Sequence, residues 1–504
     1  MSEGAVTKEA NVQSDQSVHT SLNAARTSAC ATRRVITVAP MPPEKCAYAL
    51  ARYSRSPDSI RDSVEWVRTH DSQKFLESFY FQYGHASIAD LGHVVLCFEG
   101  ISELAATEVE DEQVWDGQAR SSRYQDFSKS GFVTPPELDT SQAAVYSQAA
   151  EKLLAGYHHV HGKVLESLEA RLPRPESMKP EVYQRNLRAR AFDVARYLLW
   201  LGIPTGVGQV TSIRTLERQV RRMKASEYQE VRELAGEIGE ACAAEPNCQW
   251  DANAPSEAVA PTLARHVDTD QHLAQSRAEL TEWAAQNLPA YTPAYTEAVD
   301  LLKPVDTVAD IVATLLYPVT ERPYRDLYEQ ARGWSAAQRN EVLEVALGSR
   351  GKRDDLLRNF RTAPFVYDIV MDIGAYRDMH RHRRCQKFRQ NYTGNLGYET
   401  PQLVADAGAA AIYDDAMRAA FAAVRALPEP GAHYLLPFGA RSRFLFKMDF
   451  AEAEYIARLR SGVKGHFSYR QIAWEMKCAM ESLEPELGRL IEATPPWVED
   501  PLRR

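Results

Sequence analysis

The sequence repeats one order of local patterns, and this repetition constrains the fold more than any other feature. An apolar run, a charged stretch and a turn ending in proline follow one another in residues 94–135 and again in 365–401. Residues 195–202 then match 432–439, and each segment leads into a stretch with apolar residues at helical spacing. Because the matches keep the same order, we interpret the 504-residue chain as one unit that was duplicated and fused.

Each copy combines strand and helix patterns. Between residues 365 and 373, apolar residues occupy every second position, which is the signature of a strand. After the matched segment of the first copy, Ile213, Leu216, Val220 and Met223 recur at steps of three and four and so share one face of a helix. The sequence therefore predicts an α+β fold of two tandem copies, each helix-rich with a small sheet.

Local composition divides the chain into four parts. Residues 1–34 are rich in Ser, Thr, Ala and Asn, so we expect a disordered tail. The first copy is expected to span 35–244 and the second 297–504. The intervening residues 245–296 carry closely spaced prolines together with Asp and Asn, which predicts a connector with short helical pieces.

Overall composition argues against several classes of protein. The 59 Lys and Arg residues against 68 Asp and Glu residues leave a net charge of −9, which argues against a dedicated nucleic-acid binder. No apolar run approaches the roughly 18–20 residues of a membrane-spanning helix, so we expect no membrane segment. Seven cysteines without a C-x-x-C pair, and an N-terminus without an apolar leader, favour a cytoplasmic location.

The most basic segment is 377–389, which contains six Lys or Arg residues and one Asp. Guanidinium groups suit bidentate binding of phosphate, although such a run is also typical of a solvated helix face or a nucleic-acid patch. His380 and His382 lack a neighbouring carboxylate ligand, so we expect no metal site. The basic neighbours of Cys385 would lower a thiol pKa, but we favour a structural role for this residue.

The corresponding stretch of the first copy, 108–113, is acidic. It cannot hold a phosphate, so it either faces the basic segment of the other copy across an interface or is solvated. Downstream, residues 120–124 restore two arginines and two serines. Such groups suit nucleotide oxygens, although a surface turn would have the same composition.

These motifs resemble those of the flavin-dependent thymidylate synthases. The signature of that family is an R-H-R triplet followed by S-x-N-E-x-S-x-R-Y, with an earlier G-H-x-S segment and a later N-A-R-S-L helix. The first copy carries G-H-A-S at 84–87, S-S-R-Y at 121–124 and S-I-R-T-L at 212–216. The second copy carries R-H-R at 381–383 and, later, the L-R and G-H pairs at 459–460 and 465–466. The resemblance covers both copies.

The resemblance implies an enzyme that binds FAD, reduces it with NADPH and transfers a methylene group from methylenetetrahydrofolate to the C5 of dUMP. The residues that it implies for FAD are His85, Arg214, Arg381, His382, Arg383 and His466. Those that it implies for the nucleotide are Ser121, Arg123, Tyr124, Arg196 and Arg460. Of these, Arg381 and Arg460 are the implied catalytic residues. A homodimer of fused chains would imitate the family's tetramer.

The family motifs are divided between the copies. The first copy has Asp111, Glu112 and Gln113 in place of R-H-R, and the second lacks S-x-R-Y. Neither copy alone has a complete site, so we expect R-H-R to meet Arg123, Arg196 and Arg214 around FAD and a pyrimidine nucleotide. Such converging guanidiniums need an anion to neutralise them.

Two alternatives remain open. Beside thymidylate synthesis stand a divergent flavoenzyme that acts on another pyrimidine or a specialised metabolite, and a non-catalytic descendant that binds nucleotides.

Overall fold

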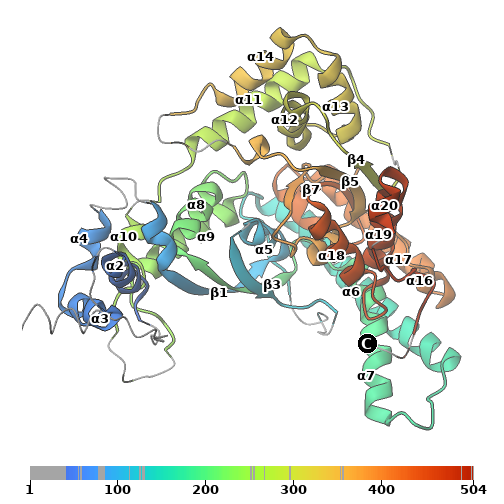
Figure 1. Cartoon of the computed structure of the whole chain (residues 1–504). Coiled ribbons are helices and arrows are strands. Elements are labelled where there is room, and N and C mark those ends of the chain that lie inside the picture. Colours follow the sequence, from blue (N-terminus) through green and yellow to red (C-terminus); the bar gives the residue numbers. More distant parts are fainter. Residues whose placement is uncertain are drawn as a thin grey trace, which may run out of the picture.

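A computed structural model describes residues 41–502 (Figure 1), apart from residues 55, 57, 58, 78–85, 113, 124–126, 128–130, 250–252, 254, 255, 266, 295, 296, 352, 353, 355, 356, 490 and 501. The predicted tail, 1–34, therefore lies outside the described residues. Even the 32-residue helix α6 (Thr140–Arg171) lacks the apolar stretch needed to cross a membrane, as do the other described helices.

The first half contains a three-stranded antiparallel sheet in the order β1-β3-β2. Ser102 ends β1, and its Oγ accepts a hydrogen bond from the amide of Ala105 (3.0 Å), which starts helix α5. Ser212 ends β3 and caps α8 in the same way. The elements in chain order are β1 (His93–Ser102), α5 (Glu103–Glu110), β2 (Trp115–Ala119), α6, α7 (Pro180–Ala195), β3 (Pro204–Ser212), α8 (Ile213–Lys224) and α9 (Gln229–Ala243).

The second half repeats this order. Its sheet runs β4-β5-β7-β6, which adds one edge strand to the arrangement of the first half. Asp372 and Asp449 cap the helices that follow β5 and β7, as Ser102 and Ser212 do in the first half. The elements are β4 (Val299–Leu302), β5 (Phe365–Asp372), α15 (Ile373–Met379), β6 (Gln386–Arg389), α17 (Ala410–Ala426), β7 (Arg441–Met448), α18 (Phe450–Arg460) and α19 (Phe467–Leu483). The predicted tandem α+β fold is confirmed.

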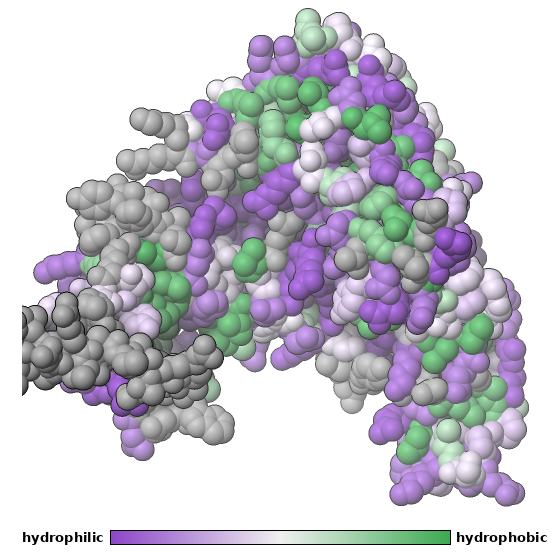
Figure 2. Space-filling model, viewed as in Figure 1, coloured by the Kyte–Doolittle hydropathy of each residue, from purple (hydrophilic) through white to green (hydrophobic). Residues whose placement is uncertain are grey.

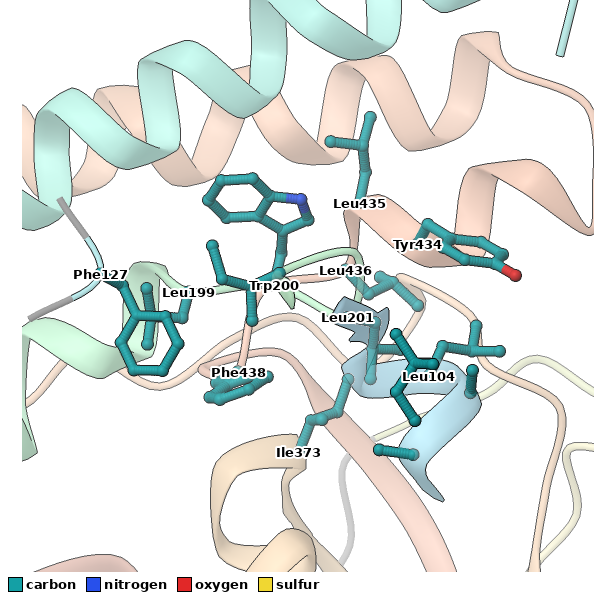
Figure 3. Close-up of a cluster of buried hydrophobic side chains, with 14 of the residues drawn as sticks. Leu104, Phe127, Leu199, Trp200, Leu201, Ile373, Tyr434, Leu435, Leu436 and Phe438 are labelled. Carbon is teal, nitrogen blue, oxygen red and sulfur yellow. The ribbon is translucent and has the colours of Figure 1, made fainter. Parts of the chain in front are cut away.

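The halves join through the two segments that match in the sequence. Trp200 and Pro437 form an antiparallel bridge. The amide of Leu201 donates to the carbonyl of Leu436 (3.0 Å), and the amide of Gly439 donates to the carbonyl of Tyr197 (2.9 Å). Because equivalent segments pair antiparallel, an approximate twofold axis relates the halves. The buried side chains around the bridge come from both halves, so they share one core (Figure 3).

The twofold relation breaks down at the outer faces of the two sheets. A layer of four helices covers the second sheet, where Val366, Phe388 and Leu445 are buried against it (Figure 1). The helices are α11 (Gln271–Asn287), α12 (Thr307–Leu316), α13 (Tyr324–Gly333) and α14 (Ala336–Leu347). In the first half, α2 (Pro43–Tyr53), α3 (Ile60–Thr69) and α4 (Ser72–Leu76) lie to one side of the sheet (Figure 1). Val95 and Val210 are 68% and 41% exposed there.

The residues of the central strands explain this difference. Counted back from the caps Ser212 and Asp449, Gly206, Gly208 and Val210 stand where the second half has Arg443, Leu445 and Lys447. Lys447 and Arg443 bind carboxylates beneath the helical layer, whereas glycine and valine offer no such anchor. The 17-residue helix α11 belongs to this layer, so the prediction of short helical pieces in 245–296 is wrong for α11.

Candidate functional site

The R-H-R segment lines a cavity of about 950 Å³ between the two halves, here called the R-H-R cavity. Residues 381–384 and helix α18 form one side, and the edge of the first sheet with Trp115, Asp116 and Ser212 forms the other. This volume lies within the range of about 300–1,000 Å³ that is typical of small-molecule sites. The described residues include no group of three His, Cys, Asp or Glu side chains that could hold a metal ion.

His382 holds Arg460 at the wall of the R-H-R cavity. The Nε of Arg460 donates to the Nε2 of His382 (2.8 Å), while the Nδ1 of His382 lies 3.6 Å from Glu452 Oε1. Burial lowers the pKa of His382, so the ring is neutral near pH 7. Nε2 must be the unprotonated nitrogen to accept from arginine, which assigns the proton to Nδ1.

Arg381 and Arg383 differ in how far they are already neutralised. Arg383 donates to Asp116 Oδ1 (2.7 Å), and its guanidinium lies 5.2 Å from the centre of the Trp115 ring. The Nε of Arg381 is buried and has no hydrogen-bond partner among the described residues. A buried donor without an acceptor is costly, so Arg381 is the group of the triplet best suited to a ligand.

Arg123 and His466 lie together and do not line the R-H-R cavity, although Arg123 and Arg460 lie over the same Tyr469 ring (5.9 and 5.6 Å). Arg123 donates through Nε and Nη2 to both oxygens of Asp193 (2.7 and 3.1 Å) and through Nη1 to the hydroxyl of Tyr469 (3.0 Å). Burial lowers the pKa of Arg123, but Asp193 raises it by more, so the guanidinium stays charged. His466 contacts the Asp193 carbonyl through Nε2 (2.7 Å) and caps α19 through Nδ1. The Ser121 Oγ accepts from the amide of Arg123 (3.2 Å) within a turn.

Arg196 is 1% exposed and also faces an internal anion. Both of its Nη groups donate to Asp378 Oδ2 (3.3 Å each), and Nη2 also donates to the carbonyl of Gly374 (3.2 Å). Burial raises the pKa of Asp378, but Arg196, Arg123 and Arg381 together hold it below its usual value. Arg123, Arg196 and Arg381 therefore surround an anion that belongs to the chain itself, whereas Arg214 pairs with Asp90. In the sequence, Asp378 is the one acidic residue of the basic segment 377–389, and it was the signal from which this internal anion could have been predicted.

Comparison with known proteins shows the family. A family model described as "Thymidylate synthase complementing protein" matches residues 34–245 and 320–486. The chain belongs to this family. The resemblance to the flavin-dependent thymidylate synthases is thereby confirmed.

Two UPF0159 proteins are among the relatives of this chain. A UPF0159 protein of Chlamydia muridarum is 28% identical over 415 residues, which cover 78% of this chain and 76% of that protein. A UPF0159 protein of Thermoplasma acidophilum is 24% identical over 485 residues, or 88% of this chain and 94% of that protein. Among solved structures, thymidylate synthase X of Helicobacter pylori, with FAD and dUMP, is 15% identical. The match covers 40% of this chain and 88% of the Helicobacter pylori chain, with a TM-score of 0.27.

Three further family positions lie apart from the R-H-R cavity or outside the described residues. Arg214 donates to Asp90 Oδ2 (2.9 Å) and lines a second cavity. His85 and Tyr124 lie outside the described residues. Of the residues that the family motifs suggest, the structure thus brings Arg381, His382, Arg383 and Arg460 together in one cavity.

The acidic stretch of the first half faces the basic segment of the second, as one of our two interpretations predicted. Buried Arg377 pairs with Glu103 (2.5 Å), Arg389 with Glu108 (2.8 Å) and Arg358 with Asp111 (2.7 Å). Burial raises the pKa of Asp111, but Arg358 and other partners hold it well below its usual value. The halves of this family member therefore carry complementary charges at their interface.

Cys385 is not activated by its basic neighbours. The thiol is buried and donates to the carbonyl of His382 (3.1 Å). Burial raises the pKa of Cys385 to about 11, so the thiol is protonated near pH 7. The expectation of a lowered thiol pKa is therefore wrong, because desolvation outweighs the nearby positive charge.

His433, which replaces Arg196 at the matched position, makes unfolding pH-dependent. It is 2% exposed, its Nδ1 bonds the Tyr228 hydroxyl (2.9 Å), and burial lowers its pKa from 6.5 to about 4. The unfolded chain thus takes up the proton first, so stability that is present above pH 6.5 is lost as pH falls towards 4. Between pH 7 and 5 the loss from this residue is about 2 kcal/mol.

Urea unfolding of His433→Asn at both pH values tests this expectation. The variant should lose about 2 kcal/mol less than the wild type between pH 7 and 5. His158→Asn, which changes an exposed histidine of α6, should follow the wild type. An unchanged pH slope in His433→Asn would contradict the expectation.

Proposed function

We propose that this chain binds FAD and a uridine nucleotide in the R-H-R cavity and methylates the nucleotide, converting dUMP to dTMP. NADPH is the proposed reductant and methylenetetrahydrofolate the proposed carbon donor. One observation carries the proposal: Arg381, His382 and Arg460 of the second half line one cavity with the sheet edge of the first half. Family membership supports the choice of FAD and of a pyrimidine nucleotide.

The side chains of the R-H-R cavity fit a flavin nucleotide. Tyr455, which is 44% exposed, supplies aromatic surface for a flat ring, and Arg381 supplies a buried donor without an acceptor among the described residues. Of the acidic lining residues, Asp116 accepts from Arg383, Glu454 accepts from Arg458, Asp449 caps α18 and Glu452 faces His382. Arg381 and Arg460 form no ion pair with a described residue, so their charge is available for phosphate groups.

The proposed roles follow from these contacts. Bound FAD would supply hydride transfer. Arg381 would bind an anionic group of the cofactor or substrate through its free Nε. Arg460 uses only its Nε for a hydrogen bond to a described residue, so its Nη groups would bind the nucleotide. His382 would act as a positioning residue, because it fixes Arg460 while adding no charge of its own.

The optical spectrum of the purified protein tests cofactor binding, and product analysis tests the reaction. We expect a flavin absorbance band, with FAD released on denaturation. Incubation with dUMP, methylenetetrahydrofolate and NADPH should yield dTMP by mass spectrometry, and expression should rescue a thymidine auxotroph. Colourless protein that cannot be loaded with FAD would contradict the proposal.

A second candidate is a non-catalytic nucleotide-binding descendant. The observation that favours it is that Asp193 and Asp378 engage Arg123 and Arg196, two of the arginines that the family motifs suggest for the substrate. A divergent flavoenzyme acting on another pyrimidine is a related alternative. Flavin-loaded protein that forms no dTMP would favour this alternative, and protein that binds a nucleotide but no flavin would favour the descendant.

We also propose a homodimer of fused chains and a cytoplasmic location. Light scattering of the purified protein and fractionation of the source cells test these two expectations.

A further inference from the structure

A second cavity occupies the position related to the R-H-R cavity by the approximate twofold axis. It measures about 530 Å³ and lies between α5 and α8 of the first half, α11 of the helical layer, and α15 and β6 of the second half. Figure 1 shows α8 facing α11 across this region. Helix α8 is the counterpart of α18 and β6 is the counterpart of β2, which line the R-H-R cavity. The second cavity is therefore the equivalent of the first, built from exchanged halves.

The charges of the second cavity come from different residues. Asp111 and Glu112 stand in the place of R-H-R, and Arg358 and Arg222 bind them (2.7 and 3.0 Å). Eight lining residues are arginines and six are Asp or Glu, so the cavity carries an excess of positive charge. Hydrophilic side chains are prominent between the helical layer and the part of the molecule below it (Figure 2). This balance favours a small anion.

His380 supplies a second, independent sign of a ligand. It lines the cavity and is 2% exposed, and neither ring nitrogen has a hydrogen-bond partner among the described residues. The nearest carboxylate oxygens, on Glu110 and Asp111, lie 3.6 and 3.7 Å away, which is too far for a hydrogen bond. Leaving such a group unsatisfied costs about 1–3 kcal/mol, which a ligand with a donor or acceptor would recover.

The remaining walls suit a flat ring. Tyr376 and Phe388 line the cavity, and the Tyr376 ring lies 5.0 Å from that of His380. Towards α8 and α11, Arg221 has one carboxylate contact among the described residues, at 3.8 Å. Arg277 is 45% exposed and donates through Nη2 to Glu227 (3.1 Å) and Asn391 (2.7 Å), which leaves its Nη1 for a ligand. These arginines suit a phosphate. The volume of about 530 Å³ lies within the range of about 300–1,000 Å³ that is typical of small-molecule sites.

We propose that this second cavity is a binding site for a nucleoside monophosphate. Arg221 and Arg277 bind the phosphate, Tyr376 and Phe388 contact the base, and His380 forms a hydrogen bond with it. The site does not depend on the proposed methylation, because its test uses neither flavin nor folate.

Calorimetric titration with UMP tests the proposal in a full-length background that carries Arg381→Gln and Arg460→Gln, which disables the R-H-R cavity. We expect this background to bind one UMP per chain. Adding Arg221→Gln and Arg277→Gln should weaken UMP binding at least tenfold. Adding Arg185→Gln and Arg188→Gln, two exposed arginines of α7, should leave it unchanged.

Two outcomes would overturn the proposal. One is a background variant that binds no UMP while its thermal unfolding matches that of the wild type. The other is unchanged affinity in the variant with Arg221→Gln and Arg277→Gln. Uridine and inorganic phosphate should each bind at least tenfold more weakly than UMP, and equal binding of uridine would contradict the phosphate contacts.

Discussion

Replacing both Arg381 and Arg460 with glutamine is expected to lower the affinity for FAD at least a hundredfold. Hydrogen bonds that involve a charged group contribute about 1.5–3 kcal/mol each, and a hundredfold change corresponds to about 2.7 kcal/mol. Neither guanidinium forms an ion pair with a described residue within 4 Å, so the substitutions strip no carboxylate of a direct partner. Folding should therefore be preserved while binding is lost.

Quenching of flavin fluorescence on titration measures this loss. Arg383→Gln is the matched control within the triplet, because Asp116 already neutralises Arg383 in the free protein. We expect this control to lose less than tenfold in affinity. If the affinity of the double variant for FAD is within threefold of the wild-type affinity, the R-H-R cavity is not the cofactor site.

The contrast between Arg381 and Arg196 shows what sequence reasoning could and could not predict about the site. The division of the family motifs between the copies predicted that R-H-R would lie against the first half, because neither copy has a complete set of motifs, and R-H-R does share a cavity with Trp115 and Asp116. The partners of buried arginines were out of reach, because Asp193 is 70 residues from Arg123, and Asp378 is 182 residues from Arg196. Spacing along the chain carries no information about such contacts.

The fold, too, was predictable from the sequence only in part. Alternation in 365–373 was enough to predict β5, although both faces of the strand are buried, because polar Asp368 lies on the face opposite the apolar residues and pairs there with Arg443. The pairing of the segments around Trp200 and Pro437 was not predictable, because similarity between segments indicates equivalence and not contact. Helix α11 was missed because prolines on either side of it, such as Pro261 and Pro289, dominated the pattern.

The anchor of the helical layer gives the largest expected change in stability. Lys447 donates to both oxygens of Asp310 (2.7 and 2.8 Å) and to the hydroxyl of Thr314 (3.2 Å). The Lys447 and Asp310 side chains are 0% and 2% exposed. Lys447→Met should reduce the free energy of unfolding by about 3–5 kcal/mol, because it leaves a buried carboxylate without its cation.

Denaturant unfolding followed by tryptophan fluorescence measures this loss, since Trp283 and Trp334 pack together in the helical layer (ring centres 5.8 Å apart). Val210→Met changes the equivalent position of the first half, which is partly exposed, and should shift stability by less than about 0.5 kcal/mol.

Adding Asp310→Leu to Lys447→Met should restore most of the lost stability, because an apolar pair of similar volume needs no cation. If the double variant is as unstable as Lys447→Met, the cost lies in packing and not in the unpaired charge. Recovery would instead show that the cost lies in the buried carboxylate of Asp310 left without its cation. The first half, with Val210 in place of the lysine, has no such anchor, and its own helices lie to one side.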